Sequence, residues 1–206
     1  MSDEQVVPQS FDRLDPDPVR QFRQWLEDAQ QVGSAQPYAM TLSTVGSDII
    51  PSSRIVLLRG IEDNGFVFFT NYDSPKGQHL RESLYAALLF YWAELSRQVR
   101  IVGVVERLAA EASDRYFASR PRGHQLEAHA SPQSRVISGR DELIERFEAV
   151  KQRYAGKDVP RPANWGGYRI VPDSIEFWRE GENRLHDRWR YRRDRQNNWL
   201  MEQLAP

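Results

Sequence analysis

The sequence predicts a mainly β fold, an antiparallel barrel or sandwich with peripheral helices. Short runs rich in β-branched and aromatic residues recur along the chain, separated by tight-turn signals such as Asp63-Asn64-Gly65. Helical periodicity is confined to a few segments between these runs. Many short strands joined by tight turns are typical of both architectures, and strand spacing alone does not separate them.

The first element is expected to be a helix that begins after Asp17. Asp17 can cap it, Pro18 fits its first turn, and apolar residues follow at helical spacing as far as a stop at Gly33. A second helix is expected to begin at Ser74, with Pro75 in its first turn. The remaining predicted elements are helices over 110–120 and 141–154 and strands over 38–45, 53–59, 66–71, 85–92, 98–108, 167–171, 174–179 and 185–192, with 197–204 pairing with the last strand.

The composition of the 206-residue chain is that of an ordinary globular protein: 40% hydrophobic, 28% charged, a net charge of -1 and no cysteine. The lack of cysteine excludes a disulfide scaffold and a thiol nucleophile. Near-neutral charge argues against a nucleic-acid partner. The polar N-terminus lacks a secretory pattern, and no run approaches the roughly 18 apolar residues that span a bilayer. We therefore expect a cytoplasmic protein without membrane association, with residues 1–14 as a flexible arm and 15–206 as a single domain.

Basic side chains gather in four local clusters. In the first, an apolar run predicted to be a buried strand has Arg54 and Arg59 near its ends. In the second, Ser74-Pro75-Lys76-Gly77, a lysine lies at a helix start, where free N–H groups and the helix dipole suit a phosphate. Taken alone, each of these two is explained more simply by ordinary surface cations.

The third cluster, Ser119–Gln125, contains two arginines and a histidine, and arginine binds phosphate through a forked pair of donors. In the fourth, a strand would place Arg184, His186 and Arg188 on one face. Three potential cations on one face repel each other, which favours a bound anion over simple exposure.

Together the four clusters indicate a small ligand with phosphate groups rather than a nucleic-acid groove. The sequence contains no Gly-x-Gly-x-x-Gly fingerprint, Walker loop or Gly-x-Ser-x-Gly elbow. Its four histidines lack zinc-like spacing with carboxylates, so no metal site is predicted. The residues themselves thus predict a β protein that binds small phosphorylated, aromatic ligands.

The same clusters resemble the pyridoxine/pyridoxamine 5'-phosphate oxidase family from about residue 17 to residue 206. In order, the stretches that carry the resemblance are RIVLL, FFTNYDSPKG, ERL, YFASRPRG, SPQSR, WGGYR, IEFW, NRLHDR and QLAP. The resemblance implies a split-barrel fold with FMN bound at a two-fold homodimer interface. It also implies oxidation of the C4' position of a small-molecule substrate, pyridoxine or pyridoxamine 5'-phosphate, to the aldehyde, with O2 as acceptor and H2O2 as product.

Site residues are carried over by matching position. Arg59, Tyr116, Arg120 and His124 are expected to meet the substrate phosphate. Arg184 and His186 are expected to lie over the substrate ring as the catalytic residues, while the flavin carries the redox chemistry. The expected FMN-binding residues, drawn partly from each subunit, are Arg54, Ile55, Val56, Leu57, Leu58, Arg59, Phe69, Thr70, Lys76, Gln98, Gln133, Ser134, Trp178 and Arg188.

The chain departs from the family pattern at several positions. Arg59 and His124 stand where lysine and serine are common, so Arg59 keeps the charge but offers a forked donor. Pro75 replaces a position that is often basic and cannot contact a phosphate. The N-terminal arm lacks the Arg-x-x-Tyr pattern that folds over the substrate in some members.

Two other functions stay open. A phenazine-biosynthesis-type FMN oxidase would take a tricyclic, non-phosphorylated substrate, and Arg59, Tyr116 and Arg120 argue against it. A non-catalytic flavin or vitamin B6 carrier would not need Arg184 and His186 beside the ring. The sequence does not separate pyridoxine phosphate from pyridoxamine phosphate as the preferred substrate.

Overall fold

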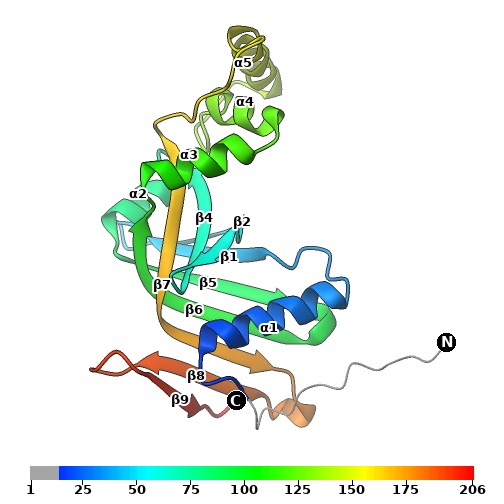
Figure 1. Ribbon diagram of the computed structural model, residues 1–206, viewed down its shortest axis with the longest axis vertical. Coiled ribbons are helices and arrows are strands. Elements are labelled where there is room, and N and C mark those ends of the chain that lie inside the picture. Colours follow the sequence, from blue (N-terminus) through cyan, green and yellow to red (C-terminus); the bar gives the residue numbers. More distant parts are fainter. Residues whose placement is uncertain (1–13) are drawn as a thin grey trace, which may run out of the picture. The chain divides into compact units, whose positions relative to one another are not determined.

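The computed structural model of the chain describes residues 14–206 (Figure 1). Nine strands and five α-helices lie in this range, so the prediction of a mainly β fold with peripheral helices is confirmed. Nearly all of the predicted flexible arm lies outside the described residues. In chain order the elements are α1 (Pro18–Gln31), β1 (Ala39–Val45), β2 (Pro51–Leu57), β3 (Gly60–Glu62), β4 (Gly65–Asn71), α2 (Pro75–Glu82), β5 (Tyr85–Trp92), η2 (Ala93–Leu95), β6 (Arg97–Arg107), α3 (Ala110–Ser119), α4 (Arg122–Ala130), α5 (Arg140–Arg153), β7 (Trp165–Arg179), η3 (Glu182–Arg184), β8 (Asp187–Arg193) and β9 (Trp199–Gln203).

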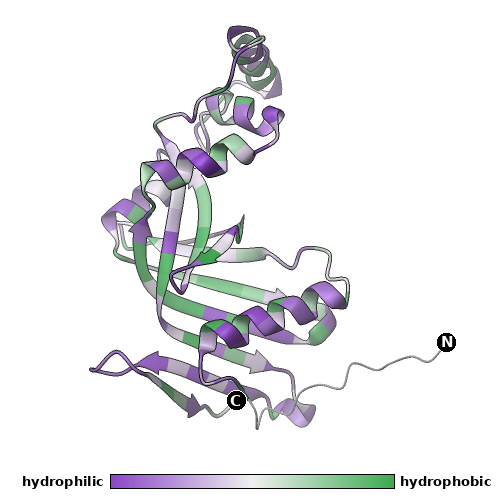
Figure 2. Cartoon of the chain, viewed as in Figure 1, coloured by the Kyte–Doolittle hydropathy of each residue, from purple (hydrophilic) through white to green (hydrophobic). Residues whose placement is uncertain are grey.

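The strands form one sheet in the order β2-β1-β5-β6-β7-β4-β3, and β8 pairs with both β7 and β9. The pairs β1–β2, β3–β4, β4–β7, β7–β8 and β8–β9 are all antiparallel. The predicted pairing of 197–204 with the preceding strand is therefore confirmed. Apolar residues run along β5 and β6, whereas β8 is mostly hydrophilic (Figure 2).

The chain divides into two compact units, here called unit 1 and unit 2. Within the described range, unit 1 contains residues 14–37, 89–101 and 173–206, and unit 2 contains 38–88 and 102–172. Strands β5, β6 and β7 each contribute residues to both units. The single domain expected for residues 15–206 stays a prediction.

Helix α1 supplies much of the core of unit 1. Its predicted cap is present, since Asp17 Oδ1 accepts hydrogen bonds from the backbone N of Val19 at 2.8 Å and of Arg20 at 3.3 Å. Phe22 is fully buried, and its ring lies 4.8 Å from the ring of Phe90 in an edge-on contact. The apolar spacing in the sequence therefore becomes a buried helix face.

Helices α3, α4 and α5 follow β6 in unit 2, and α4 packs against α5 (Figure 1). Their core contains Phe117, Leu126 and Trp165, all of which are buried. Helix α4 is absent from the sequence prediction, which places no helix between 120 and 141. A helix that begins directly after Pro121 without a side-chain cap, and carries a glycine in its first turn, gives little helical signal.

Strand β7 is one continuous strand where the sequence predicts two, at 167–171 and 174–179. Its residues up to Ile170 pair with β4, and its residues from Ser174 pair with β8. Pro172 has no N–H group, but it lies between these two ladders and interrupts neither. The predicted break at the proline is therefore wrong.

Strand β2 is an edge strand rather than the buried strand that the sequence predicts. Within residues 14–206 it stands at the end of the sheet order and pairs only with β1. Ile55 is consequently 64% exposed, although its run of apolar neighbours suggested burial on both faces. No helix within residues 14–206 is long and apolar enough to cross a membrane.

Candidate active site

A cavity of about 590 Å³ lies within unit 2. Strands β2 and β4 line it together with helices α2, α3 and α4, so its wall combines residues far apart in sequence. The lining residues are Ile55, Val56, Leu57, Arg59, Phe69, Thr70, Lys76, Tyr116, Ser119, Arg120, Pro121, His124, Glu127, Gln133 and Trp165.

The start of helix α2 positions Lys76. The helix begins where the sequence predicts, and Ser74 caps it, since its hydroxyl accepts a hydrogen bond from Gly77 N at 3.4 Å. The Lys76 ammonium donates to Ser74 Oγ at 3.1 Å and to Gln133 Oε1 at 2.7 Å. Gln133 therefore ties the loop after α4 to the start of α2.

Arg54 on β2 is held by neighbouring oxygen atoms. Its Nη1 donates to Leu42 O at 3.1 Å and to Thr44 Oγ1 at 2.7 Å, and its Nη2 donates to Ser52 Oγ at 2.6 Å. All three acceptors are neutral, so the guanidinium is oriented but its charge is not neutralised. Arg54 is thus a fixed positive charge at the side of the cavity wall.

Burial disfavours the charged forms of Lys76 and Arg54. Burial, and secondarily the charge of Arg54, lower the pKa of Lys76 to about 8. Burial also lowers the pKa of Arg54. An anion placed near either group would stabilise its charged form, so the local electrostatics favour a negatively charged ligand.

Part of the cavity wall is aromatic. The rings of Phe69 and Tyr116 stack at 3.8 Å between centroids, and Trp165 lies parallel to Tyr116 at 6.2 Å. The Arg120 guanidinium lies 4.5 Å above the Trp165 ring. These contacts give the cavity a flat side of the kind that suits a ring-containing ligand.

One nitrogen atom of the Arg120 guanidinium has no hydrogen-bond acceptor among the described residues. This atom, Nη1, is buried. Burial lowers the pKa of Arg120 and so does nearby Arg59, while Glu127 and Tyr116 act in the opposite direction. A buried donor without an acceptor is rare in proteins, and it fits an anion that completes the site.

We call Arg59, Lys76 and Arg120, which line the cavity, together with Arg54, whose charge acts on Lys76, the cavity cations. Among the described residues, no carboxylate forms an ion pair with any of them. Thirteen ion pairs do form elsewhere in this part of the chain. The donor set therefore fits the phosphate groups of FMN and of a phosphorylated substrate, which both carry negative charge.

The remaining expected site residues belong to unit 1. The rings of Trp178 and His186 lie 4.8 Å apart. Gly181 N donates to His186 Nδ1 at 3.3 Å, which leaves the proton of the neutral imidazole on Nε2. The histidine is thus held on one side by the indole and oriented by a backbone N–H.

Arg184 lies in the turn η3, not in a strand. The φ angles of Asn183 and Arg184 are 53° and 64°, and left-handed backbone does not continue a strand. The prediction that Arg184, His186 and Arg188 share one strand face is therefore wrong, because β8 begins only at Asp187. A left-handed arginine costs about 1–3 kcal/mol, and such strain is often found at functional sites.

The structure brings together most, but not all, of the expected residues. The cavity wall includes Ser119 of the third basic cluster and Glu127 of α4, and sequence reasoning missed Glu127 because α4 gave no helical signal. The side chain of Leu58 is buried in the core, and Arg54 and Ser134 are not in the lining. Unit 1 carries the other expected residues, namely Gln98, Trp178, Arg184, His186 and Arg188.

Within residues 14–206 no group of three or more His, Asp or Glu side chains is arranged to hold a metal ion.

The antiparallel sheet thus carries a cavity with cationic and aromatic lining residues, which is the kind of lining that suits a small anionic ring compound. A family model described as pyridoxamine 5'-phosphate oxidase matches residues 26–154. A second model, described as the pyridoxine 5'-phosphate oxidase C-terminal dimerisation region, matches residues 165–206. The chain belongs to the pyridoxine/pyridoxamine 5'-phosphate oxidase family.

Individual relatives agree with this assignment. The chain is 52% identical to a pyridoxine/pyridoxamine 5'-phosphate oxidase from Salinibacter ruber, over 96% of this chain and 93% of that protein. Its structure is similar to that of PhzG from Burkholderia lata in complex with tetrahydrophenazine-1-carboxylic acid, with a TM-score of 0.90, 32% identity and 98% of each chain covered. A pyridoxamine 5'-phosphate oxidase-related, FMN binding protein from Nostoc punctiforme shares the fold, with a TM-score of 0.74 and 17% identity over 93% of this chain and 100% of that one. The family, the enzyme class and the split-barrel fold expected from the sequence are thereby confirmed.

Two glycines near the cavity give the first testable prediction. A Cβ at Gly77 would lie 2.3 Å from the backbone oxygen of Tyr72, whereas a Cβ at Gly123 would meet nothing within 4 Å. Gly77→Ala is expected to lower the free energy of unfolding by about 1–3 kcal/mol through this clash. Gly123→Ala, the matched control in helix α4, should raise it by up to about 1 kcal/mol. Urea denaturation measures both, and a Gly77→Ala protein as stable as the wild type would contradict the prediction.

Proposed function

We propose that this chain is an FMN-dependent oxidase that converts pyridoxine 5'-phosphate or pyridoxamine 5'-phosphate to pyridoxal 5'-phosphate. In this proposal O2 is the electron acceptor and H2O2 the second product. The observation that carries the proposal is the set of cavity cations without carboxylate partners, next to a stacked aromatic wall. Such a cavity needs anionic ligands with flat rings, and both FMN and the substrate are of this kind.

Within this proposal the cofactor phosphate binds to Arg54, Lys76 and Ser134. The strand segment 55–58 would meet the flavin through backbone groups and the accessible side chains, with Phe69, Thr70 and Gln133 nearby. The hydrogen bond from Lys76 to Gln133, at 2.7 Å, supports one continuous site for these groups. When bound, FMN supplies the two-electron redox chemistry that protein side chains lack.

The substrate phosphate is assigned to Arg59, Tyr116, Arg120 and His124. The unpartnered Nη1 atom of Arg120 supports this assignment, because it offers a buried donor toward an anion. Arg184 and His186 are assigned to the substrate ring, where they would orient C4' and hold a proton. The His186 contacts with Trp178 and Gly181 N support a fixed imidazole, which suits such a role.

A homodimer is part of the same proposal, with Gln98, Trp178 and Arg188 of the partner subunit meeting the flavin. Strand β5 supports a second copy, because it is apolar on both faces. Leu88 and Phe90 on one face are fully buried, whereas Tyr85 and Tyr91 on the other are 51% and 60% exposed. A strand apolar on both faces is typical of one covered on both faces. The match to the dimerisation region of the family agrees with this.

A phenazine-type oxidase is the second candidate. It is favoured by the similarity to PhzG in complex with tetrahydrophenazine-1-carboxylic acid. That ligand carries a carboxylate rather than a phosphate, so it would use fewer of the cavity cations. A non-catalytic flavin or vitamin B6 carrier would bind the same ligands without turnover.

Peroxide production separates these functions. The flavin-loaded wild type should form H2O2 with pyridoxine 5'-phosphate, and its kcat/KM for unphosphorylated pyridoxine should be at least about 100-fold lower. Each charge-assisted hydrogen bond to the phosphate contributes about 1.5–3 kcal/mol, and about 2.7 kcal/mol corresponds to a hundredfold. Arg120→Ala should narrow this gap by weakening use of the phosphorylated substrate alone. Equal use of both substrates would move the phenazine-type function to first place, and binding without peroxide would favour a carrier.

The Lys76 pKa predicts a pH dependence of FMN affinity. Because the pKa is lowered to about 8, the free protein loses this charge as the pH rises through that value. The FMN phosphate stays dianionic over the same range, since its second pKa is about 6. Affinity measured by flavin fluorescence should therefore fall about tenfold between pH 7 and pH 9. Lys76→Arg keeps its charge and should flatten the profile, whereas equal affinity for riboflavin would contradict the phosphate assignment.

The dimer is tested by light scattering on the flavin-loaded protein. The expected mass is twice the 24.0 kDa of one chain. Tyr91→Glu, which puts a charge on the outer face of β5, should shift the mass toward one chain because burying an unpaired carboxylate is costly. Val136→Glu changes a fully exposed residue and is the matched control. A wild-type mass of one chain with flavin bound would be incompatible with a shared site.

A further inference from the structure

Strand β7 carries a buried carboxylate that has no place in the proposed chemistry. The side chain of Glu176 is only 5% exposed, yet it is an acid on a strand next to two arginines. Burial of an ionised carboxylate is unfavourable unless cations and hydrogen bonds compensate for it. The partners of the Glu176 carboxylate must therefore compensate for the unfavourable burial of its charge.

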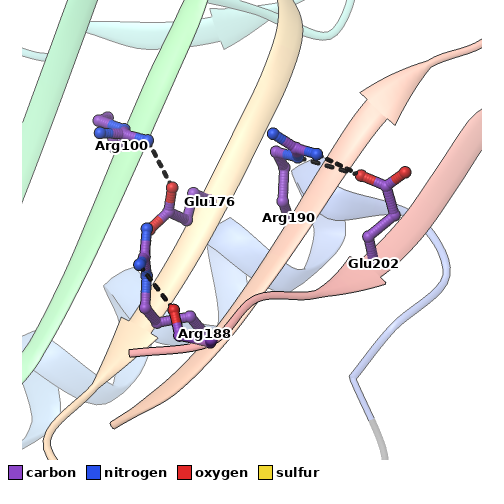
Figure 3. Close-up of polar contacts among 6 residues, drawn as sticks. Arg100, Glu176, Arg188, Arg190 and Glu202 are labelled. Carbon is purple, nitrogen blue, oxygen red and sulfur yellow. Dashed lines mark hydrogen bonds and ion pairs between the residues drawn. The ribbon is translucent and has the colours of Figure 1, made fainter.

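Each oxygen of Glu176 serves a different arginine (Figure 3). Oε1 accepts two hydrogen bonds from Arg188, from Nε at 3.0 Å and from Nη2 at 2.8 Å. Oε2 accepts one from Arg100 Nη2 at 2.5 Å. The carboxylate thus joins β6, β7 and β8 within unit 1.

The contacts leave Arg188 little rotational freedom. Its Nη1 donates to the backbone oxygen of Ala205 at 2.9 Å, and Leu204 N donates to Arg188 O at 2.9 Å. Three of the five N–H groups of the guanidinium are thereby engaged within the chain, which leaves two for a ligand. A planar fork held at three points presents its remaining donors in one fixed direction.

The neighbourhood of Glu176 is the part of unit 1 assigned to the flavin. Arg188 is the direct cross-strand partner of Trp178, and Glu176 lies two residues before Trp178 on the same face of β7. Arg100 likewise lies two residues after Gln98 on β6. The buried carboxylate thus contacts Arg188 and shares a strand face with Trp178, both of which are assigned to the cofactor.

We propose that Glu176 is a positioning residue for the flavin site: it fixes the Arg188 guanidinium so that its two remaining donors meet FMN. This inference rests on the proposed function, in which Arg188 contacts the cofactor. The role of Glu176 is indirect, since both of its oxygens are already occupied by arginines. Loss of its charge would leave two guanidiniums facing each other and would free Arg188 to turn.

The same sheet offers a matched control. Glu202 on β9 also bridges two arginines, with Oε2 accepting from Arg190 Nη2 at 2.7 Å and Oε1 from Arg192 Nε at 2.8 Å. Its side chain is 30% exposed, and neither arginine is assigned to the flavin. Glu176→Gln and Glu202→Gln therefore remove the same charge from the same kind of bridge. Arg188, a partner of Glu176, is assigned to the flavin, whereas Arg190 and Arg192, the partners of Glu202, are not, although Arg190 is the cross-strand neighbour of Glu176.

The test is FMN titration of the full-length protein freed of flavin, read by fluorescence. Glu176→Gln is expected to weaken FMN binding by about tenfold or more, because Arg188 loses a charge-assisted partner. Glu202→Gln should change it by less than about twofold, as expected of an exposed pair. In a double-mutant cycle with Arg188→Gln, adding Glu176→Gln should have no further effect on the affinity. That non-additivity would not arise from a general loss of stability.

The outcomes separate this inference from the proposed function. If Arg188→Gln binds FMN as the wild type does, the flavin role of Arg188 fails and this inference fails with it. If Arg188→Gln weakens binding but Glu176→Gln does not, or if the two changes are additive, only this inference is overturned. An equal loss in Glu202→Gln would also overturn it. Should Glu176→Gln not fold, Glu176→Asp keeps the charge one methylene short, and wild-type FMN affinity in that variant would contradict the proposal.

Discussion

Positive charge without internal compensation is the constraint on which the site in unit 2 depends. Lys76 and Arg54 lie close enough for the charge of Arg54 to lower the pKa of Lys76, and neither has a carboxylate partner among the described residues. A fold retains such an arrangement only if other interactions hold the cations in place. Here the neutral oxygens of Thr44, Ser52 and Gln133 do so, since they orient the donors without cancelling their charge. These two side chains are thus oriented while their positive charge stays available to an anion.

The side chains of Leu108 and Phe69 lie close to the backbone of Gly167, which allows the aromatic wall to form beside these cations. A Cβ at Gly167 would lie 2.5 Å from Leu108 Cδ1 and 2.8 Å from Phe69 Cε1. The glycine therefore lets Phe69 lie against strand β7, where it can stack on Tyr116. Leu108 N donates to Gly167 O at 3.0 Å, which brings the start of helix α3 to the same strand. The cavity wall therefore depends on glycine at position 167, because any side chain there would push Phe69 away from strand β7.

Local signals in the sequence were sufficient for much of the fold. The bounds of β5 agree with the prediction, and the caps at Asp17 and Ser74 are present, because strand alternation and capping chemistry depend on adjacent residues. The failures depend on the tertiary structure. The exposure of Ile55 follows from the place of β2 in the sheet order, and Pro172 is tolerated because two ladders meet there. Neither fact is encoded in a short window of sequence.

The residues of the candidate site show the same difference between what local sequence predicts and what depends on the tertiary structure. The chemical type of Lys76, Arg120 and His186 pointed to a phosphorylated ligand, and the resemblance to a known family then assigned their roles. Sequence could not show that Nη1 of Arg120 lacks a partner, since that depends on the surrounding fold. It also could not show Glu176, because an isolated glutamate on a strand carries no signal until its two arginine partners are seen. Charge type was thus predictable, whereas charge compensation was not.

Charge compensation also distinguishes the cavity cations of unit 2 from the site arginine Arg188 of unit 1. The cavity cations of unit 2 have no carboxylate partners among residues 14–206, whereas in unit 1 Arg188 is paired with Glu176 and Arg179 with Asp187. A compensated arginine contributes direction through its remaining N–H groups more than it contributes net charge. Under the proposed function, unit 2 would therefore supply the affinity for phosphate, and unit 1 would supply the orientation of the rings. In a homodimer that combines unit 2 of one subunit with residues of unit 1 from its partner, a phosphate could bind without disturbing the geometry at C4', because the two tasks rest on separate networks.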